Sequence, residues 1–153
     1  MVTFILPTIA TMQSEVDFLR TLEAGRIPPD GFGHRNHIRA AWAYVRQYDL
    51  LQATARMRRT LQGLANAHGT PQKYHETVTC AYVLLVHERL ARDPDPDDWN
   101  GFADRHPELF EWNPGLMEKI YGPDVLRSAE AKRQFLLPSV AAVPTAESTG
   151  TAT

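Results

Sequence analysis

The sequence predicts an all-α protein: a helical bundle of about four main helices, short C-terminal helices and a disordered tail. Apolar residues recur at offsets of three and four in four successive segments, the spacing of one face of an α-helix. Glycines and prolines separate these segments, and no second β-branched run offers a strand partner to the N-terminal one. Cys80–Val86 has no charged side chain, which is typical of the central helix of a bundle.

The chain of 153 residues has the length of a single domain, which we expect at residues 1–137, followed by a disordered tail at 138–153. Its 16 Lys and Arg and 18 Asp and Glu give a net charge of −2 without a basic stripe, so nucleic acid is not an expected partner. The apolar residues 2–10 are too few to span a membrane. The single cysteine, Cys80, reads as a small buried hydrophobe in a cytoplasmic protein. The sequence leaves the oligomeric state open.

The N-terminal half of the chain reads as an extended arm followed by two helices. Residues 1–12 are expected to be the arm, because their β-branched residues favour extension. Ser14 is a candidate N-cap for the first helix, which should stop at Gly25. The turn residues that follow deliver the chain into a second helix, from His34 to about Tyr48.

A third helix should run from Leu51 to a glycine C-cap at His68–Gly69, and a fourth should begin near Pro71 or Gln72. The acidic, proline-containing segment 93–98 breaks the fourth helix and opens a short helix with Trp99. Short helical turns are expected from residue 106 to residue 126.

His34 and His37 lie three residues apart at the start of the second helix, on its inward face. This spacing allows two imidazoles to bind one metal ion, and the positive end of the helix dipole keeps both rings neutral. The alternative is structural: His34 caps the helix and His37 makes a hydrogen bond in the core.

His75 opens the most apolar helix, where it needs a partner. If the third helix runs antiparallel between the second and the fourth, His34, His37 and His75 meet at one end of the bundle. Three histidines leave an open coordination position, which is a catalytic arrangement. Neutral imidazoles suit Zn, Fe, Cu and Ni alike, so the identity of the divalent transition metal stays open.

Glu76 follows His75 and is the candidate general base; the alternative is an exposed glutamate favoured by the helix dipole. Polar and aromatic side chains near the histidines are candidates for a substrate pocket: Trp42, Tyr44, Tyr74, Thr79 and Tyr82.

The remaining histidines and a group of arginines are expected outside the site. His68 ends a helix, His87 belongs to a solvated helix end and His106 precedes a proline. The arginines on the third helix read as a solvated face: Arg56, Arg58 and Arg59.

The segments Gly33–Trp42, His68–Gly69 and Lys73–Thr79 together resemble an uncharacterised family of small bacterial helical proteins with an HxxH…YHxT pattern. The resemblance covers most of residues 30–120 and implies no activity. In kind, the chain is also similar to helical-bundle metalloproteins that hold one metal with three histidines.

The leading hypothesis is a metal-dependent enzyme acting on a small organic substrate. Zn would favour hydrolysis, elimination or isomerisation, and Fe or Cu would favour oxygen-dependent oxidation. A metal-free enzyme with histidine acid–base catalysis is the first alternative. The second is a non-catalytic helical module that binds a ligand or a partner.

Overall fold

The computed structural model of the chain describes residues 9–111 and 115–138. Throughout these residues the regular elements are helices, which confirms the predicted all-α class. Residues 1–8 of the expected arm and 139–153 of the expected tail lie outside the described part. No helix within the described part combines the length and the apolar character needed to cross a membrane.

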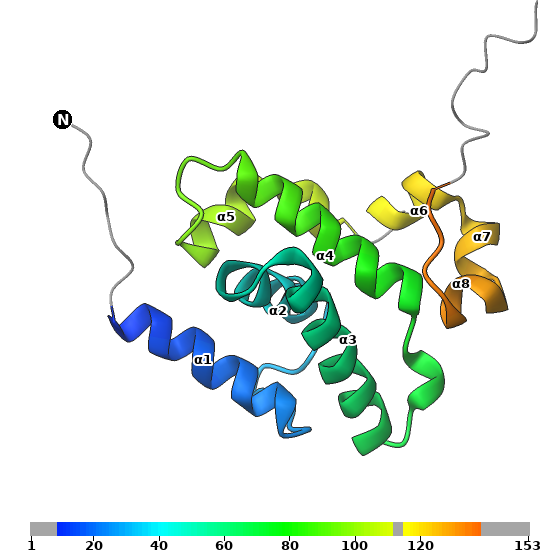
Figure 1. The fold of residues 1–153 in the computed structure, drawn as a ribbon, viewed down its shortest axis with the longest axis horizontal. Helices are drawn as coiled ribbons and strands as arrows, with labels where there is room; N and C mark the ends of the chain where they lie inside the picture. The colour runs from blue at the N-terminus through cyan, green and yellow to red at the C-terminus, as the bar shows by residue number, and fades with distance from the viewer. Residues whose placement is uncertain (1–8, 112–114, 139–153) are drawn as a thin grey trace, which may run out of the picture.

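Figure 1 shows α2, α3 and α4 at the centre, with α1 on one side against α2 and α3 and shorter helices at both ends of α4. The elements in chain order are α1 (Ile9–Glu23), α2 (His34–Gln47), α3 (Leu50–Ala67), the 3₁₀ turn η1 (Pro71–Lys73), α4 (Glu76–Ala91), α5 (Trp99–Arg105), the 3₁₀ turn η2 (Pro107–Phe110), α6 (Leu116–Tyr121), α7 (Pro123–Arg127) and α8 (Ala129–Arg133).

The structure corrects the predicted starts of two helices. Helix α1 begins at Ile9, so Ser14 is not its N-cap and residues 9–12 are not an extended arm. Ala, Met and Gln, all good helix formers, lie between Ile9 and Ser14, and they extend the helix past the cap signal. Helix α4 begins at Glu76 and not near Pro71, because the Pro71–Lys73 segment forms a separate 3₁₀ turn.

Helices α2, α3 and α4 pack against one another and form the core. Helix α2 is buried on nearly every side, and its consecutive residues Ala40–Tyr44 are fully buried. Helix α4, the predicted central helix, is buried over most of its first ten residues but exposes Leu84. The centre of the bundle is therefore shared between α2 and α4.

The C-terminal helices cover the first turns of α4 (Figure 1). The Thr77 hydroxyl donates to the Gln134 carbonyl at 2.9 Å and accepts from the Leu136 N–H at 3.1 Å. The Tyr121 hydroxyl also donates to the Leu136 carbonyl, at 2.8 Å. These bonds fix the segment that follows α8 onto the start of α4.

Candidate functional site

The turn before α2 fixes where its first two histidines lie. Gly33 is the N-cap and its backbone is extended, with φ −84° and ψ −174°, and no side chain caps the helix there. The Asn36 amide in the first turn donates back to the Gly31 carbonyl at 2.7 Å. Because Gly31 has a φ of +88°, which favours glycine, this turn closes tightly and directs His34 into the helix.

His34 is held by the 3₁₀ turn η2. Its Nε2 lies 2.7 Å from the Leu109 carbonyl oxygen. A carbonyl only accepts hydrogen bonds, so this nitrogen carries the proton. The ring packs edge-on against Tyr82, with centroids 5.1 Å apart, and against Phe110 at 6.4 Å. His34 therefore has one tautomer and one orientation.

His37 differs, because its Nε2 is buried and has no hydrogen-bond partner among the described residues. Its ring stacks on Phe32 with centroids 6.2 Å apart and lies 6.4 Å from the His34 ring. Burial, with a smaller effect from His34, lowers the pKa of His37 to about 4. The imidazole is therefore neutral at pH 7.

Tyr82 of α4 completes this cluster. Its ring lies 6.1 Å from that of His37, and the residue is 3% exposed. Burial raises the pKa of Tyr82 to about 12, so its hydroxyl stays protonated at pH 7. We call Phe32, His34, His37 and Tyr82 the histidine–aromatic centre.

His75 takes a different position from the one needed for a three-histidine site. It is the N-cap of α4, and its Nδ1 accepts from the Val78 N–H at 3.2 Å. Its Nε2 lies 2.7 Å from the Leu126 carbonyl oxygen and so carries the proton. Both ring nitrogens are therefore engaged. His34 and His37 contact Tyr82. At 1.5 Å per residue, Tyr82 lies about 10 Å along α4 from His75, so His75 is at a different level of the helix from the pair.

In residues 9–111 and 115–138, no group of three or more His, Cys, Asp or Glu is arranged to hold a metal ion. The rings of His34 and His37 are neighbours, with centroids 6.4 Å apart, and the orphaned His37 nitrogen suits the role of a ligand. His75 does not fit with the hydrogen bonds it makes here. The predicted three-histidine site stays a prediction.

Glu76 belongs to a buried polar cluster. Its carboxylate pairs with the Arg58 guanidinium, with Nη2 to Oε2 at 3.0 Å, and accepts from the Tyr74 hydroxyl at 3.2 Å and the Cys80 thiol at 3.3 Å. Burial raises the pKa of Glu76, but the hydrogen bonds from Arg58 and Cys80 outweigh it, and the pKa lies below its usual value. A carboxylate with these donors is a weak base, and the role of Glu76 as a general base stays a prediction.

The other predicted pocket residues lie in different environments. The Trp42 indole packs on Trp99 at 5.4 Å and donates to the Pro96 carbonyl at 3.1 Å. The Tyr44 hydroxyl contacts Glu23 of α1, at 2.7 Å. Thr79 is buried in α4. Among these five predicted pocket residues, Tyr82 has a ring contact with both histidines.

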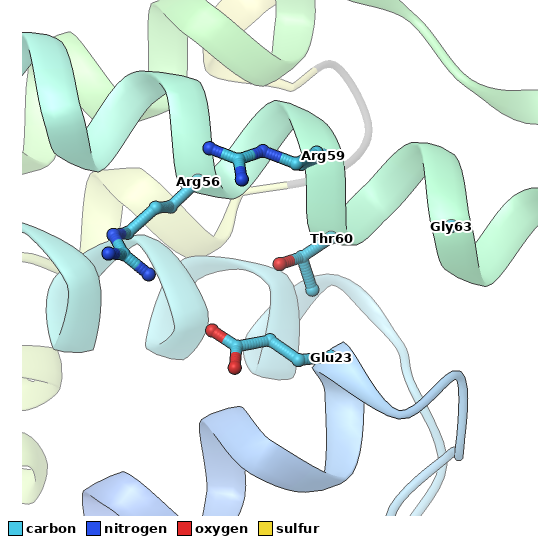
Figure 2. A pocket seen from close by; sticks show the side chains of 5 residues that line it. All are labelled: Glu23, Arg56, Arg59, Thr60 and Gly63. Atoms are coloured by element: carbon cyan, nitrogen blue, oxygen red, sulfur yellow. The ribbon is translucent and has the colours of Figure 1, made fainter.

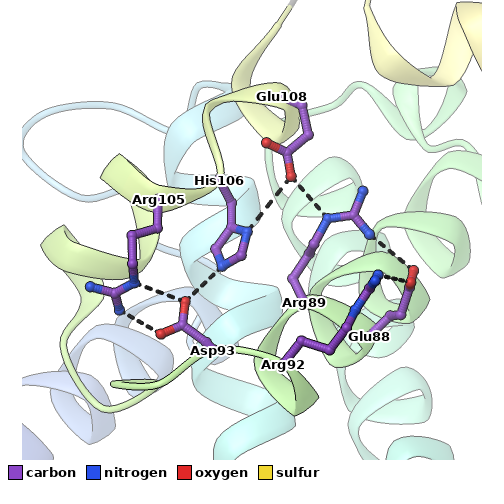
Figure 3. Close-up of polar contacts among 7 residues, drawn as sticks. All are labelled: Glu88, Arg89, Arg92, Asp93, Arg105, His106 and Glu108. Carbon is purple, nitrogen blue, oxygen red and sulfur yellow. Dashed lines mark hydrogen bonds and ion pairs between the residues drawn. The ribbon is translucent and has the colours of Figure 1, made fainter.

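A second polar cluster was not expected from the sequence. His106 lies between two carboxylates, with Nε2 2.6 Å from Asp93 and Nδ1 3.7 Å from Glu108 (Figure 3). Arg105 also binds Asp93, at 2.6 Å, and Arg89 binds Glu108, at 2.9 Å. Both nitrogens of His106 face carboxylates, so this network ties α5 and η2 to the end of α4. No sequence spacing signals it, because the partners come from different elements.

Comparison with known proteins gives no match: no family model, no curated protein and no solved structure is similar to this chain. The resemblance to small bacterial helical proteins therefore stays a prediction. The fold and the site define an all-α protein with a histidine–aromatic centre between α2 and α4.

Proposed function

We propose that the chain is a metal-dependent enzyme acting on a small organic substrate, with the ion held at the start of α2 by His37 and His34. The observation that carries the proposal is the buried Nε2 of His37, which lacks a partner in the described residues. A buried polar atom without a partner costs about 1–3 kcal/mol. In a native protein such an atom calls for an ion, a water or a ligand.

The protonation state of His37 favours a metal over acid–base catalysis. With a pKa of about 4, the ring is neutral at pH 7, as a metal ligand must be. A general base works best with a pKa near the working pH, so the same ring is a weak base. Metal-bound histidines commonly donate their other ring N–H to a backbone carbonyl. His34 makes such a bond, from Nε2 to the Leu109 carbonyl.

The surrounding aromatic residues orient the pair. Phe32 stacks on His37, and Tyr82 contacts both rings. A bound Zn ion would polarise a substrate oxygen or activate water, whereas Fe or Cu would supply oxygen chemistry. The Tyr82 hydroxyl, protonated at pH 7, is available to donate to a substrate oxygen.

Metal analysis of untagged protein tests the proposal. We expect about one equivalent of Zn, Fe, Cu or Ni per chain, as isolated or after titration. His37→Gln and His34→Gln should lose it. His75→Asn should keep it, because Asn is a strong N-cap and His75 is not a ligand in this arrangement. His87→Gln is the matched control, since His87 is exposed and far along α4 from the cap.

Two results would contradict the proposal. If His75→Asn abolishes metal binding while circular dichroism shows a folded protein, the three-histidine arrangement holds and the two-histidine site is wrong. If wild type takes up no metal, the centre is metal-free. His37 Nε2 then serves to hydrogen-bond an organic ligand, which was the binding-module alternative.

A further inference from the structure

A cavity of about 270 Å³ opens between the C-terminal end of α1 and the middle of α3, away from the histidine–aromatic centre. Its lining residues are Glu23, Arg56, Arg59, Thr60 and Gly63. Figure 2 shows Glu23 rising from α1 toward the Arg56 guanidinium and Thr60 of α3. The four α3 residues recur at offsets of three and four, so they share one face of that helix.

Opposite charges line the two walls of this cavity without pairing. Glu23 comes from α1, and both arginines come from α3. In the described part of the chain, no salt bridge joins Glu23 to Arg56 or Arg59, and the recorded polar partner of Glu23 is the Tyr44 hydroxyl. Each wall therefore presents a charge to the cavity.

Two of the charged groups, Glu23 and Arg56, are held in position before any ligand arrives. The buried Tyr44 hydroxyl lies 2.7 Å from a Glu23 oxygen and 2.7 Å from the Thr60 hydroxyl, so it links the two walls. The Arg56 guanidinium lies 4.0 Å from the centre of the Tyr48 ring, a cation–π contact. Groups that are already ordered lose less conformational entropy on binding.

Gly63 leaves the cavity open at a cost to the helix. Glycine inside a helix destabilises it by about 1 kcal/mol relative to alanine. Packing does not require glycine here, because a Cβ built on Gly63 would have no atom within 4 Å. A side chain at this position would instead project into the space that the cavity occupies.

We propose that this cavity binds a small zwitterion of the amino-acid class. Its carboxylate would bind Arg56 and Arg59, and its ammonium group would bind Glu23. Arginine guanidinium groups match carboxylates in shape and charge. The volume is below the ~300–1,000 Å³ of drug-sized pockets, which suits an amino acid better than a larger metabolite.

The test is a titration of the full chain with free amino acids at millimolar concentration, followed by ¹H–¹⁵N NMR. Each amino acid that binds is compared with its N-acetyl form, which lacks the ammonium group, and its amide, which lacks the carboxylate. We expect shifts at residues around the cavity, and affinity about tenfold or more weaker for both modified forms.

Two variants probe the α3 wall separately from the fold. Arg59→Gln removes an exposed charge that has no ion pair in the described residues, and Gly63→Leu fills the cavity and raises helix propensity. Both should weaken binding about tenfold or more. Arg133→Gln, the same change on exposed α8, should not.

The proposal is overturned if no amino acid in the panel binds, or if binding is unchanged in both Arg59→Gln and Gly63→Leu. If the N-acetyl form binds as tightly as the free amino acid, the proposal is also overturned, because the ammonium group is then not recognised and the cavity is a simple anion site.

Discussion

The Asp93 carboxylate accepts bonds from two side chains and one backbone N–H, and Asp93→Asn tests how much it stabilises the fold. It accepts from Arg105 Nη2 at 2.6 Å and Nε at 3.1 Å, from His106 Nε2 at 2.6 Å, and from the Asp95 N–H at 2.9 Å. Its side chain has no exposed surface. An asparagine would keep the shape but lose the charge and turn one acceptor into a donor.

Breaking a buried ion pair costs about 3–5 kcal/mol. Arg105 is 36% exposed, so solvent compensates in part. We therefore expect Asp93→Asn to lower the free energy of unfolding by about 2–4 kcal/mol at pH 7. Urea denaturation followed by tryptophan fluorescence measures this loss, since Trp99 lies in α5 beside the network.

The stability loss caused by Asp93→Asn should also depend on pH, which gives a second test. Burial raises the pKa of Asp93, but the bonds from Arg105, the Asp95 backbone and His106 outweigh it, so the folded pKa lies below the usual value of an aspartate. The stabilisation is therefore fully present above the unfolded pKa and is lost as pH falls through the folded pKa. The difference between wild type and Asp93→Asn should shrink as the pH falls below about 4.

Asp104→Asn is the matched control, because Asp104 is an exposed residue of α5. It should change stability by less than about 0.5 kcal/mol. An Asp93→Asn variant no less stable than Asp104→Asn, or a loss that persists unchanged at pH 2.5, would refute the reasoning.

Three further predictions concern the core and the helix ends. Gly25→Ala should destabilise the protein by about 1–2 kcal/mol, because Gly25 has a φ of +77° and an added Cβ would lie 3.3 Å from the Ala67 Cβ. Gly63→Ala should stabilise it by about 0.5–1 kcal/mol, because alanine favours the helix. Thermal unfolding of the two variants tests these opposite signs. Cys80 should react with a thiol reagent at pH 8 only after unfolding in urea, because burial and Glu76 raise the pKa of its thiol to about 12; rapid labelling of the native protein would contradict this. Glu76→Gln should cost about 1–2 kcal/mol at pH 7, and because the folded pKa of Glu76 is lowered this cost should fade as pH drops below about 4.5; equal urea midpoints at pH 7 would exclude it.

The sequence predicted the elements whose ends carry local signals. Helix α3 ends where the glycine signal put it, with His68 as C-cap and Gly69 at a φ of +69°. Helix α2 runs from His34 to Gln47 as its periodicity indicated. Local sequence determines these ends because a left-handed residue after a helix is nearly always glycine.

The start of α4 could not be predicted in this way, because its cap is a histidine. His75 caps through Nδ1, a role that sequence rules assign to Ser, Thr, Asp and Asn. The Arg58–Glu76 ion pair was missed for a related reason: its partners lie on different helices, and periodicity within one helix does not report on such a pair. The predicted solvated face of α3 is confirmed at Arg58 and Arg59, which are exposed, although Arg58 also pairs with Glu76 of α4.

The polar opening of α4 prompted the metal hypothesis, since buried polar groups need partners. Protein groups are the partners of these residues. His75 bonds the Leu126 carbonyl and the Val78 N–H, Thr77 bonds the Gln134 carbonyl, and Glu76 pairs with Arg58. These residues no longer require a metal to explain their burial. The first turn of α2 differs, because the buried Nε2 of His37 has no hydrogen-bond partner in the described residues. Burial therefore calls for a ligand at His37 and not at His75, at the place where α2 meets Tyr82.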